Sequence, residues 1–252
     1  MLPYLQLGPL HIWTYGLMLA CGLWAGFLLL NGEVNRRRLP LDAGALMLAI
    51  AAAGIVGAKL YHILTILWTH AGNWSWQELW NPAGLAWNGG LLAGFAVLVG
   101  WARAKKVSVW TMLDAASPAA AIGYAFGRMG CFLAGDGDYG IPTNLPWGMS
   151  FPHGLVPTTQ RVHPTPLYEI ADSVLLFFIL RAIAGRQVTP GTVFAAYLIG
   201  SGMFRFAVEF IRLNPPVLLG LTEAQLVSLV SVVGGTVLLS WNRRRALVVA
   251  AH

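Results

Sequence analysis

Charged residues are scarce in this sequence, and their scarcity limits the kinds of protein it can encode. Only 10% of the 252 residues are Asp, Glu, Lys or Arg, whereas soluble domains carry about 25%. Hydrophobic residues make up 57% of the chain. They fall in blocks close to the length of about 20 residues that spans a bilayer. We therefore expect an all-α, polytopic membrane protein that forms one domain, residues 1–252.

Other features are also missing, and each absence excludes a class. Cysteine occurs only at Cys21 and Cys131, so the chain has no disulfide framework, and no Cys/His set has metal-ligand spacing. The net charge of +6 comes from short basic clusters between apolar blocks, which argues against nucleic acid as a partner. The N-terminus lacks the basic region and cleavage site of a signal peptide. No internal repeat of the kind found in many transporters is evident.

Seven apolar blocks predict seven transmembrane helices. They run roughly over residues 12–31, 43–67, 84–102, 109–133, 167–184, 191–211 and 222–241, with ends uncertain by about 2–4 residues. Eleven of the sixteen Lys and Arg residues follow alternate blocks, at 36–38, 103–106, 181–186 and 243–245. The positive-inside rule then places the N-terminus outside and the C-terminus in the cytoplasm.

The segments on the expected outer side differ from the basic ones. Trp74, Trp76 and Trp80 fit an aromatic belt at the outer interface. Residues 134–166 form the longest piece between blocks and contain one basic residue, Arg161. Loops longer than about 12–15 residues are usually functional or disordered. Because this one carries aromatic residues and ends at a motif, we expect an ordered extracytoplasmic cap.

Five basic residues remain outside the cytoplasmic clusters: Lys59, Arg128, Arg161, Arg205 and Arg212. Ionisable groups within membrane spans are costly and usually face a cavity or a partner. We therefore expect Arg128 and Arg205 to face one shared cavity that opens toward the outer leaflet.

The sixth block contains the motif RFAVEFIR. Its residues Arg205, Glu209 and Arg212 are spaced i, i+4 and i+7, which predicts a shared helix face. The Arg–Glu pair would leave one surplus positive charge, and Arg128 would add another. One interpretation is interfacial anchoring by long side chains. The other is an anion site, because arginine holds phosphate by paired, charge-assisted hydrogen bonds.

The segment HPTPLYE contains polar residues with two possible roles. Thr165 can be a helix N-cap, with Pro166 at the first helical position. Glu169 would then lie in the first turn, where the helix dipole favours a carboxylate. His163 precedes this helix and could act as a base, an acid or a hydrogen-bonding strut.

Three further polar positions have structural interpretations. Asp114 is expected to cap or pair structurally, and Thr222 could cap the last helix near Gln225. Cys131 could be a nucleophile favoured by Arg128 three residues earlier, or a small buried apolar side chain.

Three motifs occur together in one order: GRMGCFLAGDGDYG, HPTPLYE and GMFRFAVEFIR. In this order and spacing the sequence resembles the prolipoprotein diacylglyceryl transferase family over nearly the whole chain. The resemblance implies a multi-pass enzyme of the bacterial plasma (inner) membrane with seven spans. Such an enzyme moves a diacylglyceryl group from phosphatidylglycerol to the lipobox cysteine of a secreted precursor lipoprotein. Glycerol phosphate leaves, and no metal or other cofactor is needed.

The resemblance also implies roles for individual residues. Catalytic roles are expected for Arg128, Arg205, His163 and Glu209. Substrate binding is expected at Arg128, Arg205, Arg212, Tyr15, Asn88, Gly89, Gly90, Asp136, Tyr139 and Glu169.

Four positions depart from the family's pattern. Asn88 stands where the family has a histidine, and Ser201 where it has a tyrosine. Cys131 and Ala134 stand where it has asparagines. The base could then be His163, Glu169 or Asp136, and the acceptor could be another thiol or a lipid. A non-enzymatic lipid binder or transporter is a further alternative, against which the missing repeat counts.

Overall fold

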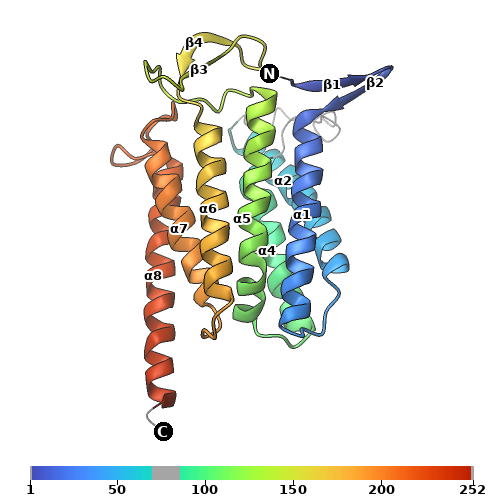
Figure 1. Cartoon of the computed structure of the whole chain (residues 1–252), viewed down its shortest axis with the longest axis vertical. Helices are drawn as coiled ribbons and strands as arrows, with labels where there is room; N and C mark the ends of the chain where they lie inside the picture. Colours follow the sequence, from blue (N-terminus) through green and yellow to red (C-terminus); the bar gives the residue numbers. More distant parts are fainter. Residues whose placement is uncertain (1, 70–85, 251–252) are drawn as a thin grey trace. The chain divides into compact units, whose positions relative to one another are not determined.

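The computed structural model describes residues 2–69 and 86–250, and the helices within them follow the apolar blocks (Figure 1). They are α1 (Thr14–Arg36), α2 (Ala43–Thr69), α4 (Trp87–Ala104), α5 (Val109–Ala134), α6 (Thr165–Ala184), α7 (Thr192–Glu209) and α8 (Glu223–Ala250). The prediction of a mainly helical chain is confirmed. The three tryptophans assigned to an interfacial belt lie outside the described residues.

Three segments of the described chain are long and apolar enough to cross a membrane: Thr14–Arg36, Ala43–Trp68 and Glu223–Arg244. Most of the side chains in each segment are not buried inside the protein. Exposed apolar helices of this length are typical of proteins whose solvent is lipid. The chain is therefore a multi-pass membrane protein, while the number of seven spans stays a prediction.

The chain divides into two compact units. One consists of Met1–Leu30 together with Leu113–His252, and the other is Asn31–Met112. Helices α1 and α5 contribute to both units. The expectation of a single domain remains untested by this division.

In the unit Asn31–Met112, α2 and α4 touch through glycine backbones. A Cβ atom added at Gly89 would lie 2.2 Å from the carbonyl oxygen of Gly57, which is far too close. Small residues let membrane helices approach in this way. Helix α2 begins after Asp42, whose carboxylate accepts the N–H groups of Gly44 at 2.7 Å and Ala45 at 3.1 Å. This is an ordinary N-cap.

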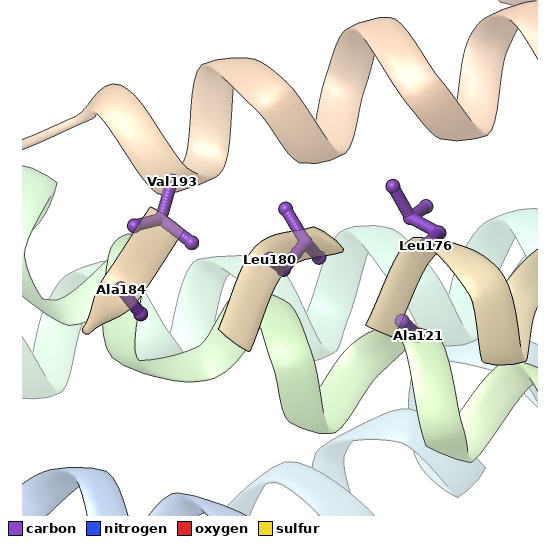
Figure 2. Close-up of a cluster of buried hydrophobic side chains, with 5 residues drawn as sticks. All are labelled: Ala121, Leu176, Leu180, Ala184 and Val193. Carbon is purple, nitrogen blue, oxygen red and sulfur yellow. The ribbon is translucent and has the colours of Figure 1, made fainter. Parts of the chain in front are cut away.

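In the other unit, α6 lies between α5 and α7 (Figure 2). Leu176, Leu180 and Ala184 recur every four residues on one face of α6, so they point to the same side. They contact Ala121 of α5 and Val193 of α7.

Helix α7 is fixed at its start by a residue from α5. Asp114 is buried and accepts the N–H groups of Gly191 and Phe194, both at 2.8 Å. Its carboxylate therefore caps α7 across the bundle, which confirms the structural role expected for it.

Two other helix starts were also predicted, with different outcomes. At the start of α8, the Thr222 hydroxyl accepts the Gln225 N–H at 3.3 Å and the Gln225 side chain accepts the Thr222 N–H at 3.0 Å. This capping box confirms that Thr222 caps α8. For α6 the prediction is wrong, because Pro164 is the N-cap and Thr165 is already helical. Glu169 lies beyond the first turn, so the helix dipole is not what stabilises it.

The segment 134–166 has secondary structure of its own. Strands β3 (Met149–Phe151) and β4 (Thr158–Val162) pair antiparallel, at the end of the bundle where α5 ends and α6 begins (Figure 1). Tyr139, Phe151 and Val162 form a buried core within the segment. We call residues 134–166 the cap segment, although its place outside the membrane stays a prediction.

A second small sheet precedes α1 and was not expected from the sequence. Strands β1 (Tyr4–Leu7) and β2 (Leu10–Trp13) form an antiparallel hairpin, and Gly8 between them has a positive φ of 61°. The expectation of an all-α chain is therefore too narrow, since two short hairpins accompany the helices.

Candidate functional site

Charged side chains gather where α5, α6 and α7 meet the cap segment. We call this group the charge cluster. Its members are Arg128 of α5, Asp138 of the cap segment, Glu169 of α6, Arg205 and Glu209 of α7, and Arg212, which follows α7.

Glu169 lies at the centre of the charge cluster, with its side chain 2% exposed. One carboxylate oxygen accepts hydrogen bonds from the Tyr124 hydroxyl at 2.7 Å and from Arg205 at 3.0 Å. The other oxygen accepts one from Arg212 at 3.0 Å and lies 3.5 Å from Nε of Arg128. Three guanidiniums therefore compensate one buried carboxylate, which makes the burial of its charge tolerable.

Glu209 connects the charge cluster to the start of α8. Its side chain is 0% exposed and forms an ion pair with Arg205 at 2.9 Å, so the expected Arg–Glu pairing is confirmed. The other carboxylate oxygen accepts hydrogen bonds from Asn214 at 2.7 Å and from Thr222 at 2.8 Å. Arg205 is thus held between two buried carboxylates and has little freedom to turn away.

Asp138 bridges two arginines from the cap segment. One carboxylate oxygen accepts a hydrogen bond from Arg128, and the other accepts one from Arg212. Burial opposes its ionisation, but the charges of Arg128 and Arg212 outweigh that effect and hold the pKa of Asp138 below its usual range. Asp138 was not among the predicted site residues, although it lies in the segment GDGDYG of the first motif.

The charge balance differs from the prediction. Three arginines face the carboxylates of Glu169, Glu209 and Asp138, so the expected surplus of positive charge is wrong for this cluster. The difference arises because two further carboxylates, Glu169 of α6 and Asp138 of the cap segment, reach the arginines from other parts of the chain.

The expected helix face is also wrong in part. Helix α7 ends at Glu209, and Arg212 instead forms a β-bridge with Gly140 of the cap segment. Arg128 and Arg205 do meet as expected, because both contact Glu169. That they line a shared cavity stays a prediction.

Cys131 and Asp136 lie beside the charge cluster. The Cys131 sulfur and the carboxylates of Asp136 and Asp138 all lie within 4.8 Å of one another. Burial raises the pKa of Asp136, and a hydrogen bond with the Cys131 thiol opposes that rise. Such a trio could ligate a metal by spacing, but the guanidinium of Arg128 lies 3.8 Å from the sulfur. Both Asp138 oxygens already bind arginines, so these residues do not fit a cation.

Two tyrosines predicted to bind substrate lie in different surroundings. Tyr15 packs on α5 two residues after Arg128, since a Cβ atom at Gly130 would lie 3.0 Å from its ring. Tyr139 is buried, stacks on Phe151 with ring centroids 4.0 Å apart, and donates a hydrogen bond to the Val156 carbonyl at 3.2 Å. Burial raises the pKa of Tyr139 to about 12. Tyr139 therefore stabilises the cap segment from within.

His163 lies where the cap segment joins α6. Its ring nitrogen Nδ1 is 3.1 Å from the Tyr168 hydroxyl, which also accepts the indole N–H of Trp147 at 2.8 Å. The backbone carbonyl of His163 accepts the N–H of Gly140 at 2.9 Å. Among the described hydrogen bonds, its ring therefore contacts Tyr168 rather than a member of the charge cluster.

Three predicted residues belong to the other unit. Asn88 is exposed in the first turn of α4. Gly89 packs against Gly57, and Gly90 lies near Gly54, with 3.1 Å from an added Cβ atom to the Gly54 oxygen. The two glycines therefore have a clear packing role in joining α2 to α4.

Taken together, the apolar helices and the cluster of partly buried arginines and carboxylates define a multi-pass membrane protein with a charged site among its helices. The profile of the family described as prolipoprotein diacylglyceryl transferase matches residues 3–241. The chain belongs to this family, which confirms the resemblance seen in its motifs.

Named relatives agree with this assignment. The phosphatidylglycerol–prolipoprotein diacylglyceryl transferase of Geobacter sulfurreducens is 35% identical over 225 residues, 86% of this chain and 84% of the relative. The protein of the same name from Methylococcus capsulatus is 34% identical over 261 residues, 95% of each chain. That of Pseudomonas putida is 32% identical over 266 residues, 97% of each chain.

Proposed function

We propose that this chain transfers a diacylglyceryl group from phosphatidylglycerol to the lipobox cysteine of a prolipoprotein, releasing glycerol phosphate. Family membership names the reaction. The observation that assigns this reaction to particular residues is that Arg128, Arg205 and Arg212 all contact the buried carboxylate of Glu169. An enzyme that expels a phosphate group needs cationic donors at that point.

The reaction requires one bond to form and one to break. The acceptor thiolate attacks the glycerol carbon that bears the phosphate, so a C–S bond forms as the C–O bond breaks. The electron pair of that bond stays on the phosphate oxygen, and glycerol phosphate leaves with one more negative charge than the phosphodiester had. Arginines placed beforehand favour this change, because their charge needs no reorganisation as the new charge develops.

Arg128 and Arg212 are the residues that would hold the phosphate. Both bind the one carboxylate of the charge cluster that is partly exposed, on Asp138. Arg205 is held between Glu169 and Glu209, so we assign it to stabilising the leaving phosphate from a fixed position. Glu209 then acts as a positioning residue for Arg205.

A base must take the proton of the thiol before attack. Glu169 is poorly suited, because its two oxygens already accept hydrogen bonds from two guanidiniums and a phenol. Asp136 already shares a hydrogen bond with Cys131. Histidine is the side chain that most often serves as a general base in enzymes. We therefore assign the base to His163, with Tyr168 orienting its ring.

We also propose the orientation that the basic residues predict. The chain would cross the bacterial inner membrane seven times, with its N-terminus and the cap segment outside and its C-terminus in the cytoplasm. A precursor lipoprotein emerging from the membrane would then meet the charge cluster on the outer side. Cysteine substitutions at Leu145 in the cap segment and at Arg186 after α6 should react with a membrane-impermeant maleimide from opposite sides.

The decisive experiment is mass spectrometry of the purified protein with phosphatidylglycerol and a lipobox peptide. We expect the peptide to gain a diacylglyceryl group while glycerol phosphate appears in equal amount. The same peptide with serine in place of cysteine serves as the control and should stay unmodified. If no phosphorylated headgroup is released, the transferase proposal is wrong and lipid binding or transport is favoured.

A further inference from the structure

One carboxylate of the charge cluster differs from the other two. Glu169 and Glu209 project from helices, and their side chains are 2% and 0% exposed. Asp138 projects from the cap segment, and its side chain is 31% exposed. The two glutamates also bind neutral donors, Tyr124 for Glu169 and Asn214 for Glu209, whereas the described hydrogen bonds of the Asp138 carboxylate are to arginines.

The geometry of Asp138 matches that of a bound phosphodiester. Its two oxygens each take one guanidinium, from Arg128 and from Arg212. A phosphodiester also presents two unbridged oxygens that share one negative charge, and arginine binds such a pair in the same way. The carboxylate therefore lies where a phosphate would find its donors.

The charge balance allows one of these anions at a time. With Asp138 in place, three guanidiniums face three carboxylates, and a phosphodiester entering beside them would carry the cluster to a net negative charge. Exchange of one singly charged anion for another avoids this, because uncompensated charge in a partly buried site is costly.

The backbone permits such an exchange without unfolding the cap segment. The Thr165 hydroxyl holds the Asp138 carbonyl, and the Asp136 carboxylate accepts the Asp138 N–H at 3.3 Å. The main chain is thus fixed while the short side chain can rotate about its Cα–Cβ bond toward the exposed side.

We infer that Asp138 is a resident carboxylate that occupies the phosphate position of Arg128 and Arg212, leaves when an anionic lipid phosphate binds, and returns to displace the phosphorylated product. The inference rests on the proposed function for the identity of the lipid and the product. Return of Asp138 helps release, since glycerol phosphate carries more negative charge than the phosphodiester and tolerates a neighbouring carboxylate less well.

The test compares the wild-type protein with Asp138→Asn in detergent micelles, using calorimetric titration with glycerol phosphate. We expect the variant to bind about tenfold more tightly, because the arginines of the wild type would be free of Asp138 for only about a tenth of the time. The matched control is Glu223→Gln, which removes an exposed negative charge at the start of α8. Its affinity should stay within about twofold of the wild type.

Steady-state kinetics provide a second test, because the expected change in KM would not occur if Asp138 had only a structural role. With phosphatidylglycerol and a lipobox peptide, Asp138→Asn should show a lower KM for the lipid and stronger inhibition by glycerol phosphate. If Asp138 only supported the fold, its loss would instead weaken binding and raise KM. Asp138→Ser repeats the test with a smaller side chain. Thermal unfolding with and without glycerol phosphate measures affinity independently of turnover.

The outcomes separate this inference from the proposed function. Unchanged or weaker binding of glycerol phosphate in both variants overturns the role of Asp138, even if the wild type transfers lipid normally. Tighter binding in both variants supports that role for a phosphate ligand. If the wild type at the same time modifies no peptide, the proposed transfer fails while the exchange of anions stands.

Discussion

The α2–α4 contact and the charge cluster of α5, α6 and α7 join helices by opposite means. In the first, Gly57 and Gly89 bring two backbones into direct contact with no room for a side chain. In the second, Arg128, Glu169 and Arg205 join three helices through charges. Each solution suits lipid, because small residues allow close packing and paired charges avoid exposure to hydrocarbon.

The difference shows where chemistry can take place. A contact between glycine backbones involves no side chain and no charge, so it offers no group that could bind a ligand. In the charge cluster, the exchange proposed above would replace one anion by another while the helices stay in place. We therefore expect substitutions in the two regions to separate activity from stability.

The largest effect is expected for Arg205→Ala. Loss of one preorganised cationic donor lowers turnover by about 10²–10³-fold in enzymes that stabilise a developing anion. Arg205→Lys should recover only part of this, since an ammonium cannot contact Glu169 and Glu209 with a planar fork. Glycerol phosphate release measures the rate. Arg186→Ala, at an exposed position after α6, is the control, and full activity in Arg205→Ala would rule out the phosphate role.

A purely structural effect is expected for Gly89→Ala. The new methyl group would lie 2.2 Å from the Gly57 carbonyl oxygen, so α2 and α4 must separate. Overpacking of this kind destabilises by about 1–3 kcal/mol. Gly100→Ala in the same helix is the control, because nothing lies within 4 Å of its added Cβ atom. Equal unfolding temperatures for the two variants would contradict the close contact.

A smaller effect separates the two N-caps. Asp114→Ala removes a buried cap from α7 and should destabilise by about 0.5–2 kcal/mol. Asp42→Ala removes the exposed cap of α2, where water can replace the carboxylate, so its effect should be smaller. Thermal unfolding of the two variants side by side tests this order, and a larger loss for Asp42→Ala would reverse it.

The smallest effect is a pH dependence at Asp138. Its pKa in the folded protein is held below the usual value, so the ionised form contributes stability above the pKa of the unfolded chain, about 4. That contribution is lost as the pH falls through the lowered pKa. The difference in unfolding temperature between wild type and Asp138→Asn should therefore shrink below about pH 4. A difference that widens in acid would show that Asp138 is not stabilised by its arginines.

Local patterns of the sequence determined much of this protein. Blocks of about 20 apolar residues sufficed to place the helices, because a helix is the way to satisfy backbone groups in lipid. Arg128 and Arg205 stood out because charges within apolar blocks are rare and costly. The i, i+4 spacing of Arg205 and Glu209 was enough to predict their pairing, because that contact lies within one helix.

The tertiary structure alone decided which charges meet. Asp138 reaches Arg212 across 74 positions of sequence, and Asp114 caps α7 across 77. The periodicity of apolar residues along the chain cannot predict such contacts, because they depend on how the helices and the cap segment pack. For the same reason the carboxylate of Glu169, expected at a helix start, lies instead among three guanidiniums. The neutrality of the cluster follows from packing and could not be counted along the chain.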